Sequence, residues 1–265
     1  MTSPLDFSGK VVIVTGGTHG IGRAIATRFL EHAAHVVVCA RSAPGAPIEQ
    51  GGRMAEFIAA NVRTPEDIER VVAGAIESFG RVDVLVNNAG GSPPAQAADC
   101  SPRFLASIIE LNLTAPFLFA QKANAVMQQQ PGGGSIINIA SVSGVRPSPG
   151  TAAYGAAKAG LLSLTQSLAV EWAPKVRVNA IAAGLIATER ADLHYGSEAG
   201  VRAAAATVPL GRLGEPKDVA DACLYLASPL ASYVTGASLL LHGGGEWPAF
   251  LGAVANARPT GGERA

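Results

Sequence analysis

Two polar side chains stand one helical turn apart in the run "YGAAK", residues 154–158, inside a segment rich in helix-forming alanine and leucine. Residues four apart are neighbours on a helix, so we expect Lys158 to lie beside Tyr154. Lowering the tyrosine pKa of about 10 by about three units requires roughly 4 kcal/mol, which an ammonium about 4 Å away supplies at an effective dielectric near 20. The spacing indicates a tyrosine that exchanges a proton with an alcohol or carbonyl oxygen. The alternative is an ordinary Tyr–Lys pair on an amphipathic helix.

A serine ends the β-branched run at 134–142, which predicts a strand. Ligands of open α/β sheets bind outside the carboxyl ends of the strands. We therefore expect the Ser141 hydroxyl to donate to the same substrate oxygen as Tyr154. A serine that only caps a turn is the alternative, and Ser143 is a nearby competitor.

A glycine-rich run, "TGGTHGIG" at 15–22, follows another predicted strand and opens a helix. The N-terminus of a helix carries unpaired N–H groups and a partial positive charge. A pyrophosphate binds there when no side chain blocks its approach, as Gly16, Gly20 and Gly22 would permit. The pattern predicts a dinucleotide site, against the alternative of a plain glycine-rich turn.

Short apolar runs alternate with helical patterns along the 265 residues. We expect strands at 10–16, 35–41, 54–61, 82–90, 134–142, 176–183 and 237–244, and helices at 20–32, 64–80, 101–130, 151–173, 188–207 and 215–228. Residues 42–52 are too rich in Pro and Gly for regular structure. Strands that are apolar on both faces and alternate with helices predict an α/β fold, a parallel doubly wound sheet flanked by helices. We place this domain at 1–245 and a C-terminal tail at 246–265.

Charge and composition limit the partners. Lys+Arg and Asp+Glu both number 20, and no basic block is visible, which argues against nucleic acid or an anionic membrane surface. We see no apolar stretch of about 18 residues and no signal peptide. The three cysteines and five histidines show no metal-ligand spacing. We expect a cytoplasmic protein that acts on a small molecule, with no metal.

Four motifs occur in order: "TGGTHGIG" at 15–22, "NNAG" at 87–90, Ser141, and "YGAAK" thirteen residues beyond that serine. Together they resemble the short-chain dehydrogenase/reductase family, and within it the 3-oxoacyl-(acyl-carrier-protein) reductases, over residues 7–245. The resemblance implies one Rossmann-like domain with seven strands in the order 3-2-1-4-5-6-7, and a nicotinamide cofactor.

The resemblance also implies which residues hold that cofactor. The expected set is Gly16, Thr18, His19, Gly20, Ile21 and Gly22 at the phosphates, Arg41, Ser42, Asn61 and Val62 at the adenosine, Asn88, Ala89 and Gly90 along the middle, and Tyr154, Lys158, Gly184, Ile186 and Thr188 toward the nicotinamide. Asn61 stands where the family usually has aspartate. Ala40 occupies the place where an acid would select NAD, and Arg41 follows it, so we expect NADP, with NAD possible.

Asn112 corresponds to the family's asparagine that helps a water relay protons from the lysine. Pro116, four residues later, has no N–H for the carbonyl of residue 112, which would leave that carbonyl free to bind water. The alternative is a packing asparagine beside a proline kink. With Ser141, Tyr154 and Lys158, Asn112 makes the expected catalytic set.

The predicted activity is hydride transfer between NADP(H) and a hydrophobic ketone or secondary alcohol, such as a 3-oxoacyl thioester or a steroid-like ring ketone. The alternatives are an enoyl reductase, whose family spaces Tyr and Lys more widely, and a non-catalytic redox sensor that binds a dinucleotide. The helix at 104–120 is apolar nearly all round, and the Tyr/Lys helix has small residues at Ala153, Ala157 and Gly160. Both features predict a homo-oligomer, a dimer or a tetramer, that pairs through these helices.

Overall fold

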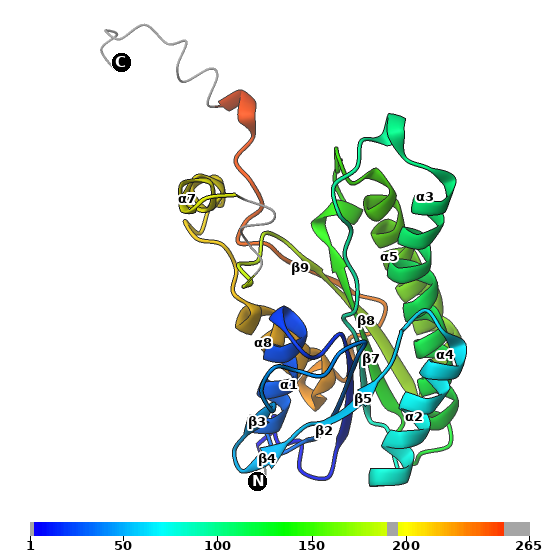
Figure 1. Cartoon of the computed structure of the whole chain (residues 1–265). Coiled ribbons are helices and arrows are strands. Elements are labelled where there is room, and N and C mark those ends of the chain that lie inside the picture. The colour runs from blue at the N-terminus through cyan, green and yellow to red at the C-terminus, as the bar shows by residue number, and fades with distance from the viewer. Residues whose placement is uncertain (1–2, 190–195, 252–265) are drawn as a thin grey trace, which may run out of the picture.

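Seven parallel strands form one sheet in the computed structural model, which describes residues 3–189 and 196–251 (Figure 1). The strands of this sheet are β1 Val11–Thr15, β2 His35–Ala40, β5 Glu56–Ala59, β6 Val84–Asn87, β7 Gly134–Ser141, β8 Val176–Ala183 and β9 Ser238–Leu241. The helices are α1 Gly20–Glu31, α2 Pro65–Phe79, α3 Pro102–Ile109, α4 Ala115–Met127, α5 Ala152–Trp172, α7 Glu198–Thr207 and α8 Pro216–Ala227.

The strand order is β5-β2-β1-β6-β7-β8-β9, which confirms the expected topology. Every neighbouring pair in this sheet is parallel. The carboxyl ends of β1 and β6 are therefore adjacent, and Ser141 at the end of β7 is in register with Ala183 of β8. This edge carries the glycine loop, the 87–90 motif and Ser141, as ligand-binding edges of open α/β sheets do.

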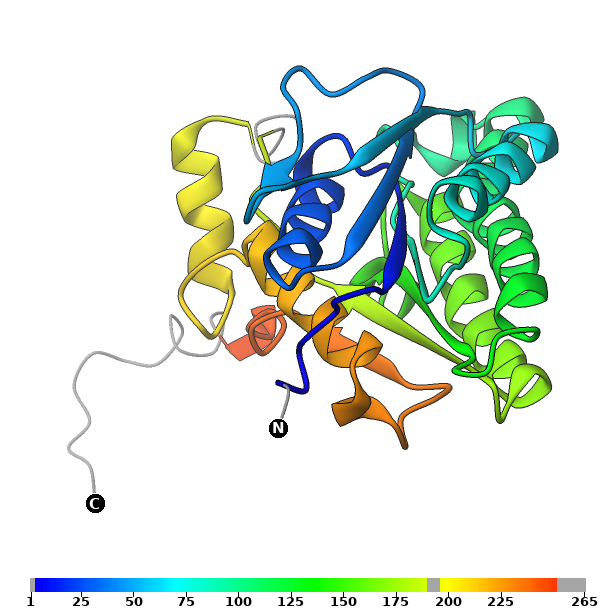
Figure 2. The same ribbon diagram turned by 90° about the horizontal axis from the view of Figure 1, so that it is seen from below.

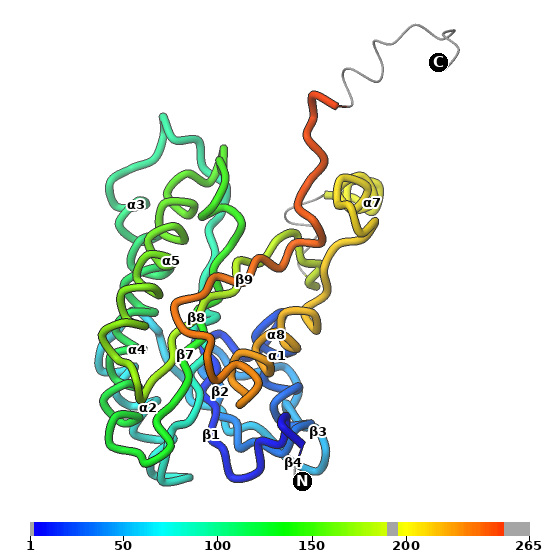
Figure 3. Tube along the Cα trace, turned by 180° about the vertical axis from the view of Figure 1, so that it is seen from behind, coloured from blue at the N-terminus to red at the C-terminus, as the bar shows by residue number. Residues whose placement is uncertain are grey.

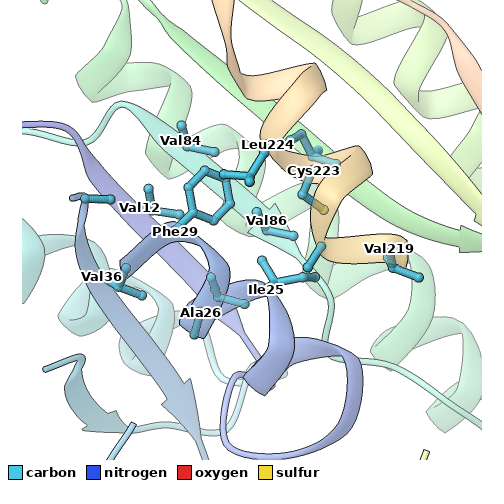
Figure 4. Close-up of a cluster of buried hydrophobic side chains, with 14 of the residues drawn as sticks. Val12, Ile25, Ala26, Phe29, Val36, Val84, Val86, Val219, Cys223 and Leu224 are labelled. Atoms are coloured by element: carbon cyan, nitrogen blue, oxygen red, sulfur yellow. The ribbon is translucent and has the colours of Figure 1, made fainter. Parts of the chain in front are cut away.

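Helices cover both faces of the sheet. Helices α1 and α8 lie on one face, and α2, α4 and α5 lie on the other (Figure 1), and Figure 2 shows the same layers from below. Figure 4 shows the first layer: Phe29 and Ile25 of α1 and Leu224 of α8 pack onto valines of β1, β2 and β6. Phe29 is fully buried. The fold class is thus a Rossmann-like doubly wound sheet, as predicted.

One covering helix differs from its expected form. The region 102–127 is continuous, but residues Glu110–Thr114 form a π-helical turn between α3 and α4. The segment Pro102–Met127 is the one described helix that is long and apolar enough to cross a membrane, with a mean hydropathy of 1.4, so our expectation that no such stretch exists was wrong. In this fold Phe119, Ala123 and Met127 are buried against the sheet.

The segment before β5 also differs. Within the proline- and glycine-rich linker, β3 Glu49–Gln50 pairs with β4 Arg53–Met54 as a small antiparallel hairpin. The predicted strand at 54–61 is therefore divided between β4 and β5. Arg23 of α1 donates to the carbonyls of Ala46 and Pro47 at 3.1 and 2.9 Å, which ties this linker to α1.

The small residues of α5 serve contacts within the chain. Ala157 is buried, and a Cβ on Gly160 would lie 3.1 Å from Leu113 of the π turn. These two residues therefore allow α5 to pack against its own neighbouring helices, and they do not support the predicted subunit interface.

The described start of the predicted tail contacts the domain. Glu246 pairs with Arg146 at 2.7 Å, and the Trp247 N–H donates to Thr207 at the end of α7 at 3.0 Å. From behind, the chain after β9 runs alongside α7 (Figure 3). Residues 252–265 of the predicted tail, and 190–195 of the helix predicted at 188–207, lie outside the described residues.

Candidate active site

The loop after β1 is shaped for close approach. Gly16 and Gly20 have φ of +64° and +53°, a conformation that favours glycine. A Cβ on Gly22 would lie 2.2 Å from the carbonyl oxygen of Gly16, so only glycine lets α1 begin this close to the loop. Ile21, from the same motif, lies in the first turn of α1 and packs against the core.

Helix α1 leaves its N-terminus without a local cap. Its first turn has no acidic residue, and the side chain of His19 makes no capping hydrogen bond. The Thr18 Oγ1 lies 3.2 Å from His19 Nδ1 on the same loop. The Gly20 N–H donates to the Glu189 carboxylate at 2.8 Å, which shows that this terminus accepts an anion. The glycine-rich loop after β1 and the N-terminus of α1, together called the glycine cradle, therefore fit the phosphates of a dinucleotide.

Residues 87–90 at the end of β6, the β6 motif, are hydrogen-bonded to the loop after β1. Thr15 Oγ1 accepts from the backbone N–H groups of Asn88 and Ala89, each at 3.0 Å. The Asn88 amide in turn donates to the carbonyls of Thr15 and Gly16 at 2.9 and 3.2 Å. Thr15 was missing from our predicted set, although its place directly before the glycines is visible in the sequence.

Tyr154 and Lys158 lie one turn apart on α5, as predicted. The Lys158 ammonium is buried, lies 5.6 Å from the centroid of the Tyr154 ring, and donates to the carbonyl of Ile139 at 2.7 Å. Ser141, at the end of β7, hydrogen-bonds with Tyr154 and accepts from the Ser143 N–H at 3.1 Å. The Ser143 N–H thus helps to fix the position of the Ser141 hydroxyl.

Asn112 and Lys158 converge on the end of the β6 motif. A Cβ on Gly90 would lie 2.8 Å from Asn112 Oδ1 and 3.2 Å from Lys158 Nζ. Glycine at this position keeps the space between the two side chains open. The structure thus brings three of the predicted residues to one place beside the sheet edge.

The side chain of Asn112 is fully buried and fixes the neighbouring loop. Its Oδ1 accepts from the Gly91 N–H at 2.9 Å, and its Nδ2 donates to the carbonyls of Gly91 and Ile108, each at 3.0 Å. The residue sits in the π turn, and such turns interrupt helices frequently at functional sites. The proton relay stays a prediction, while the contact with Gly91 gives Asn112 a positioning role.

Burial shifts the pKa values of Lys158 and Tyr154. It lowers the pKa of Lys158 to about 8. It also raises the pKa of Tyr154 above its ordinary value, and the hydrogen bond with Ser141 opposes this only in part. The predicted lowering of the Tyr154 pKa by Lys158 was therefore wrong for this structure. The reason is that the ammonium lies over the ring and binds the Ile139 carbonyl, while the phenol loses solvent.

A chain of buried amides supports α5 from behind. The Asn87 Nδ2 donates to Asn138 Oδ1 at 2.9 Å, and the Asn138 Nδ2 donates to Thr165 Oγ1 at 2.9 Å. This chain connects β6 and β7 with the helix that carries Tyr154 and Lys158. Sequence reasoning missed Asn138 and Thr165, because their partners lie 51 and 27 residues away.

The adenosine end of the predicted site is open. Arg41 and Ser42 are exposed directly after β2, and Val62 is buried after β5. Asn61 is exposed, and its Oδ1 accepts from the Arg63 N–H at 3.3 Å. A local turn therefore engages the side-chain oxygen of Asn61, one of the residues expected at the adenosine.

The predicted nicotinamide end follows β8. Gly184 packs on His242, where a Cβ would lie 2.7 Å from the His242 Cβ. Ile186 pairs with Gly214 in an isolated parallel bridge. Thr188 lies near the helix terminus, its Cγ2 3.6 Å from where a Cβ on Gly20 would stand. The segment therefore runs from the end of β8 to the start of α1.

A cavity of about 180 Å³ lies at the segments that follow β7, β8 and β9. Its lining includes Val142, which follows Ser141, and Leu185, together with His242. The Arg146–Glu246 ion pair stands at this cavity, so Arg146 is engaged by a carboxylate. Within residues 3–189 and 196–251 no group of three or more His, Cys, Asp or Glu side chains could hold a metal ion.

Comparisons with known proteins agree with this geometry. A family model described as Enoyl-(Acyl carrier protein) reductase matches residues 16–246. The 3-oxoacyl-(acyl-carrier-protein) reductase of Vibrio cholerae is 39% identical over 91% of this chain and 98% of the relative. Glucose 1-dehydrogenase 2 of Bacillus subtilis is 38% identical over 90% and 95%.

A solved structure has the same fold over nearly the whole chain. The ligand-free aldohexose dehydrogenase of Thermoplasma acidophilum superimposes with a TM-score of 0.84 at 30% identity, covering 98% of this chain and 99% of that one. The chain belongs to the short-chain dehydrogenase/reductase family and is an NAD(P)-dependent oxidoreductase.

Proposed function

We propose that this enzyme reduces a hydrophobic ketone to a secondary alcohol with NADPH, through Asn112, Ser141, Tyr154 and Lys158. The observation that carries the proposal is that these side chains converge beside the glycine cradle. Ser141 is hydrogen-bonded to Tyr154, and Asn112 and Lys158 both face Gly90. Bound NADPH would supply a hydride to the carbonyl carbon.

The protein's own groups supply the proton. Ser141 donates a hydrogen bond to the substrate oxygen and holds it near the Tyr154 hydroxyl. A raised pKa keeps Tyr154 protonated at neutral pH, so this phenol is ready to donate to the oxygen as negative charge develops. The Lys158 pKa of about 8 leaves the ammonium mostly charged at pH 7, where it lies over the Tyr154 ring and donates to the Ile139 carbonyl.

The aliphatic part of the cavity lining, Val142, Val145, Leu185 and Leu240, supports a hydrophobic carbonyl compound, a 3-oxoacyl thioester or a ring ketone, as the substrate. The test is NADPH oxidation against a panel of acyl thioesters, steroid ketones, simple ketones and sugars. We expect turnover with at least one ketone class. NADPH binding without turnover of any carbonyl would identify a redox sensor instead.

An enoyl reductase is the second candidate, because the matched family model carries that description. The Tyr154–Lys158 spacing of one turn argues for ketone reduction. A 2-enoyl thioester added to the same panel separates the two, since an enoyl reductase reduces the carbon–carbon double bond and leaves 3-oxoacyl thioesters intact.

We infer that NADPH is preferred over NADH, because Ala40 leaves no acid beside the ribose and Arg41 is exposed next to it. We also infer a cytoplasmic protein, because the three cysteines are all free.

We infer a homo-oligomer because apolar side chains are exposed on the predicted interface helices. Leu105 of α3 is 47% exposed and Val170 of α5 is 82% exposed.

A further inference from the structure

The carboxylate of Glu189, which lies far from α1 in the sequence, contacts the N-terminus of α1. The Gly20 N–H donates to Glu189 Oε1 at 2.8 Å, across 169 residues of sequence. Helix α1 has no side-chain cap from His19 and no acidic residue in its first turn. The Glu189 charge therefore meets the partial positive charge that the sequence around α1 leaves without a local acidic partner.

The cations around Glu189 are engaged by other acceptors. Glu189 lines a groove with Arg23, Arg28 and Lys217. Lys217 donates to Asp221 at 2.7 Å, and Arg28 donates to the same carboxylate at 2.6 Å. Arg23 holds backbone carbonyls of the linker after β2. The Gly20 N–H gives the Glu189 carboxylate a contact at the N-terminus of α1.

We propose that Glu189 competes with the cofactor pyrophosphate for the Gly20 N–H, and so weakens cofactor binding and speeds cofactor release. The inference rests on the proposed function, because it takes this cradle as the phosphate site. Two anions cannot share one N–H donor, so a phosphate must displace the carboxylate. Binding then loses the interaction between Glu189 and the helix terminus, and release regains it.

The test compares Glu189→Gln and Glu189→Ala with the control Glu198→Gln. Glu198 starts α7, nine residues further on, and its side chain is 94% exposed, so the control removes the same charge away from the cradle. NADPH is titrated by its fluorescence, and its release is timed by stopped flow. We expect Glu189→Gln to lower the Kd for NADPH by about two- to fivefold, mostly through slower release, and the control to match the wild type.

Thermal unfolding gives a readout apart from activity. Without NADPH, both Glu189 variants should melt below the wild type, because Glu189→Gln removes the negative charge at the N-terminus of α1 and Glu189→Ala also removes the acceptor. With saturating NADPH, the rise in Tm should be larger in both variants than in the wild type. Glu189→Ala removes the acceptor as well as the charge, so its NADPH binding should be at least as tight as that of Glu189→Gln.

Two outcomes separate the possible failures. If the wild type binds NADPH and Glu189→Gln binds it equally or more weakly, the competition is refuted and the proposed function stands. If the wild type binds neither NADPH nor NADH, the proposed function fails and the competition fails with it.

Discussion

The buried ammonium of Lys158 should make stability depend on pH in a specific direction. Its pKa falls from 10.5 to about 8 because burial disfavours the charged form. Below pH 8 both the folded and the unfolded chains bind this proton. Between pH 8 and 10.5 only the unfolded chain binds it, so this group makes folding more favourable as pH rises.

The magnitude follows from the shift. The lowering of the pKa from 10.5 to about 8 corresponds to a cost of about 3 kcal/mol at pH 7, most of which is regained by pH 10. Lys158→Met removes the charge at similar length, and leaves the Ile139 carbonyl without this donor. The free energy of unfolding of wild type minus Lys158→Met should therefore rise by about 2–3 kcal/mol between pH 7 and pH 10.

Urea unfolding at steps between pH 7 and pH 10 measures this difference. Other lysines and tyrosines titrate in the same range, but they are common to both proteins and cancel. Lys122→Met is the control, since Lys122 is a half-exposed surface lysine paired with Glu69. If the Lys158→Met curve runs parallel to the wild-type curve, the buried-ammonium reasoning is refuted. Lys158→Met should also lose carbonyl reduction at every pH.

Four further outcomes are expected. Tyr154→Phe should lower kcat for carbonyl reduction by about 10²- to 10⁴-fold while the Kd for NADPH stays within twofold; loss of both, or of neither, would contradict its role. Arg41→Ala should raise the KM for NADPH about tenfold and leave that for NADH unchanged, and clear wild-type preference for NADH would overturn the cofactor assignment. Phe29→Ala should lower the free energy of unfolding by about 3–5 kcal/mol in urea titrations, whereas a loss under 1 kcal/mol would argue against the packing between α1 and α8. Light scattering should find a dimer or a tetramer, which Leu105→Glu with Val170→Glu should dissociate; a wild-type monomer would remove the interface.

Local patterns were enough to predict the elements. β-Branched runs and glycine or proline signals located all seven strands of the sheet, and motif order indicated how they connect. The boundaries failed where packing overrides propensity. The π turn at Glu110–Thr114 is such a case, because its Asn112 accepts from the distant Gly91 N–H. The β3–β4 hairpin formed within the linker whose proline and glycine content predicted no regular structure.

The candidate site divides in the same way. Residue spacing alone specifies the glycines at 16, 20 and 22 and the one-turn separation of Tyr154 from Lys158, since both depend on helix geometry within a few residues. The pKa directions of Tyr154 and Lys158, the amide contact of Asn112 with Gly91 and the carboxylate of Glu189 on α1 depend on the assembled fold. Desolvation and hydrogen bonding are set by atoms that meet from distant parts of the chain, and no short stretch of sequence records which ones meet.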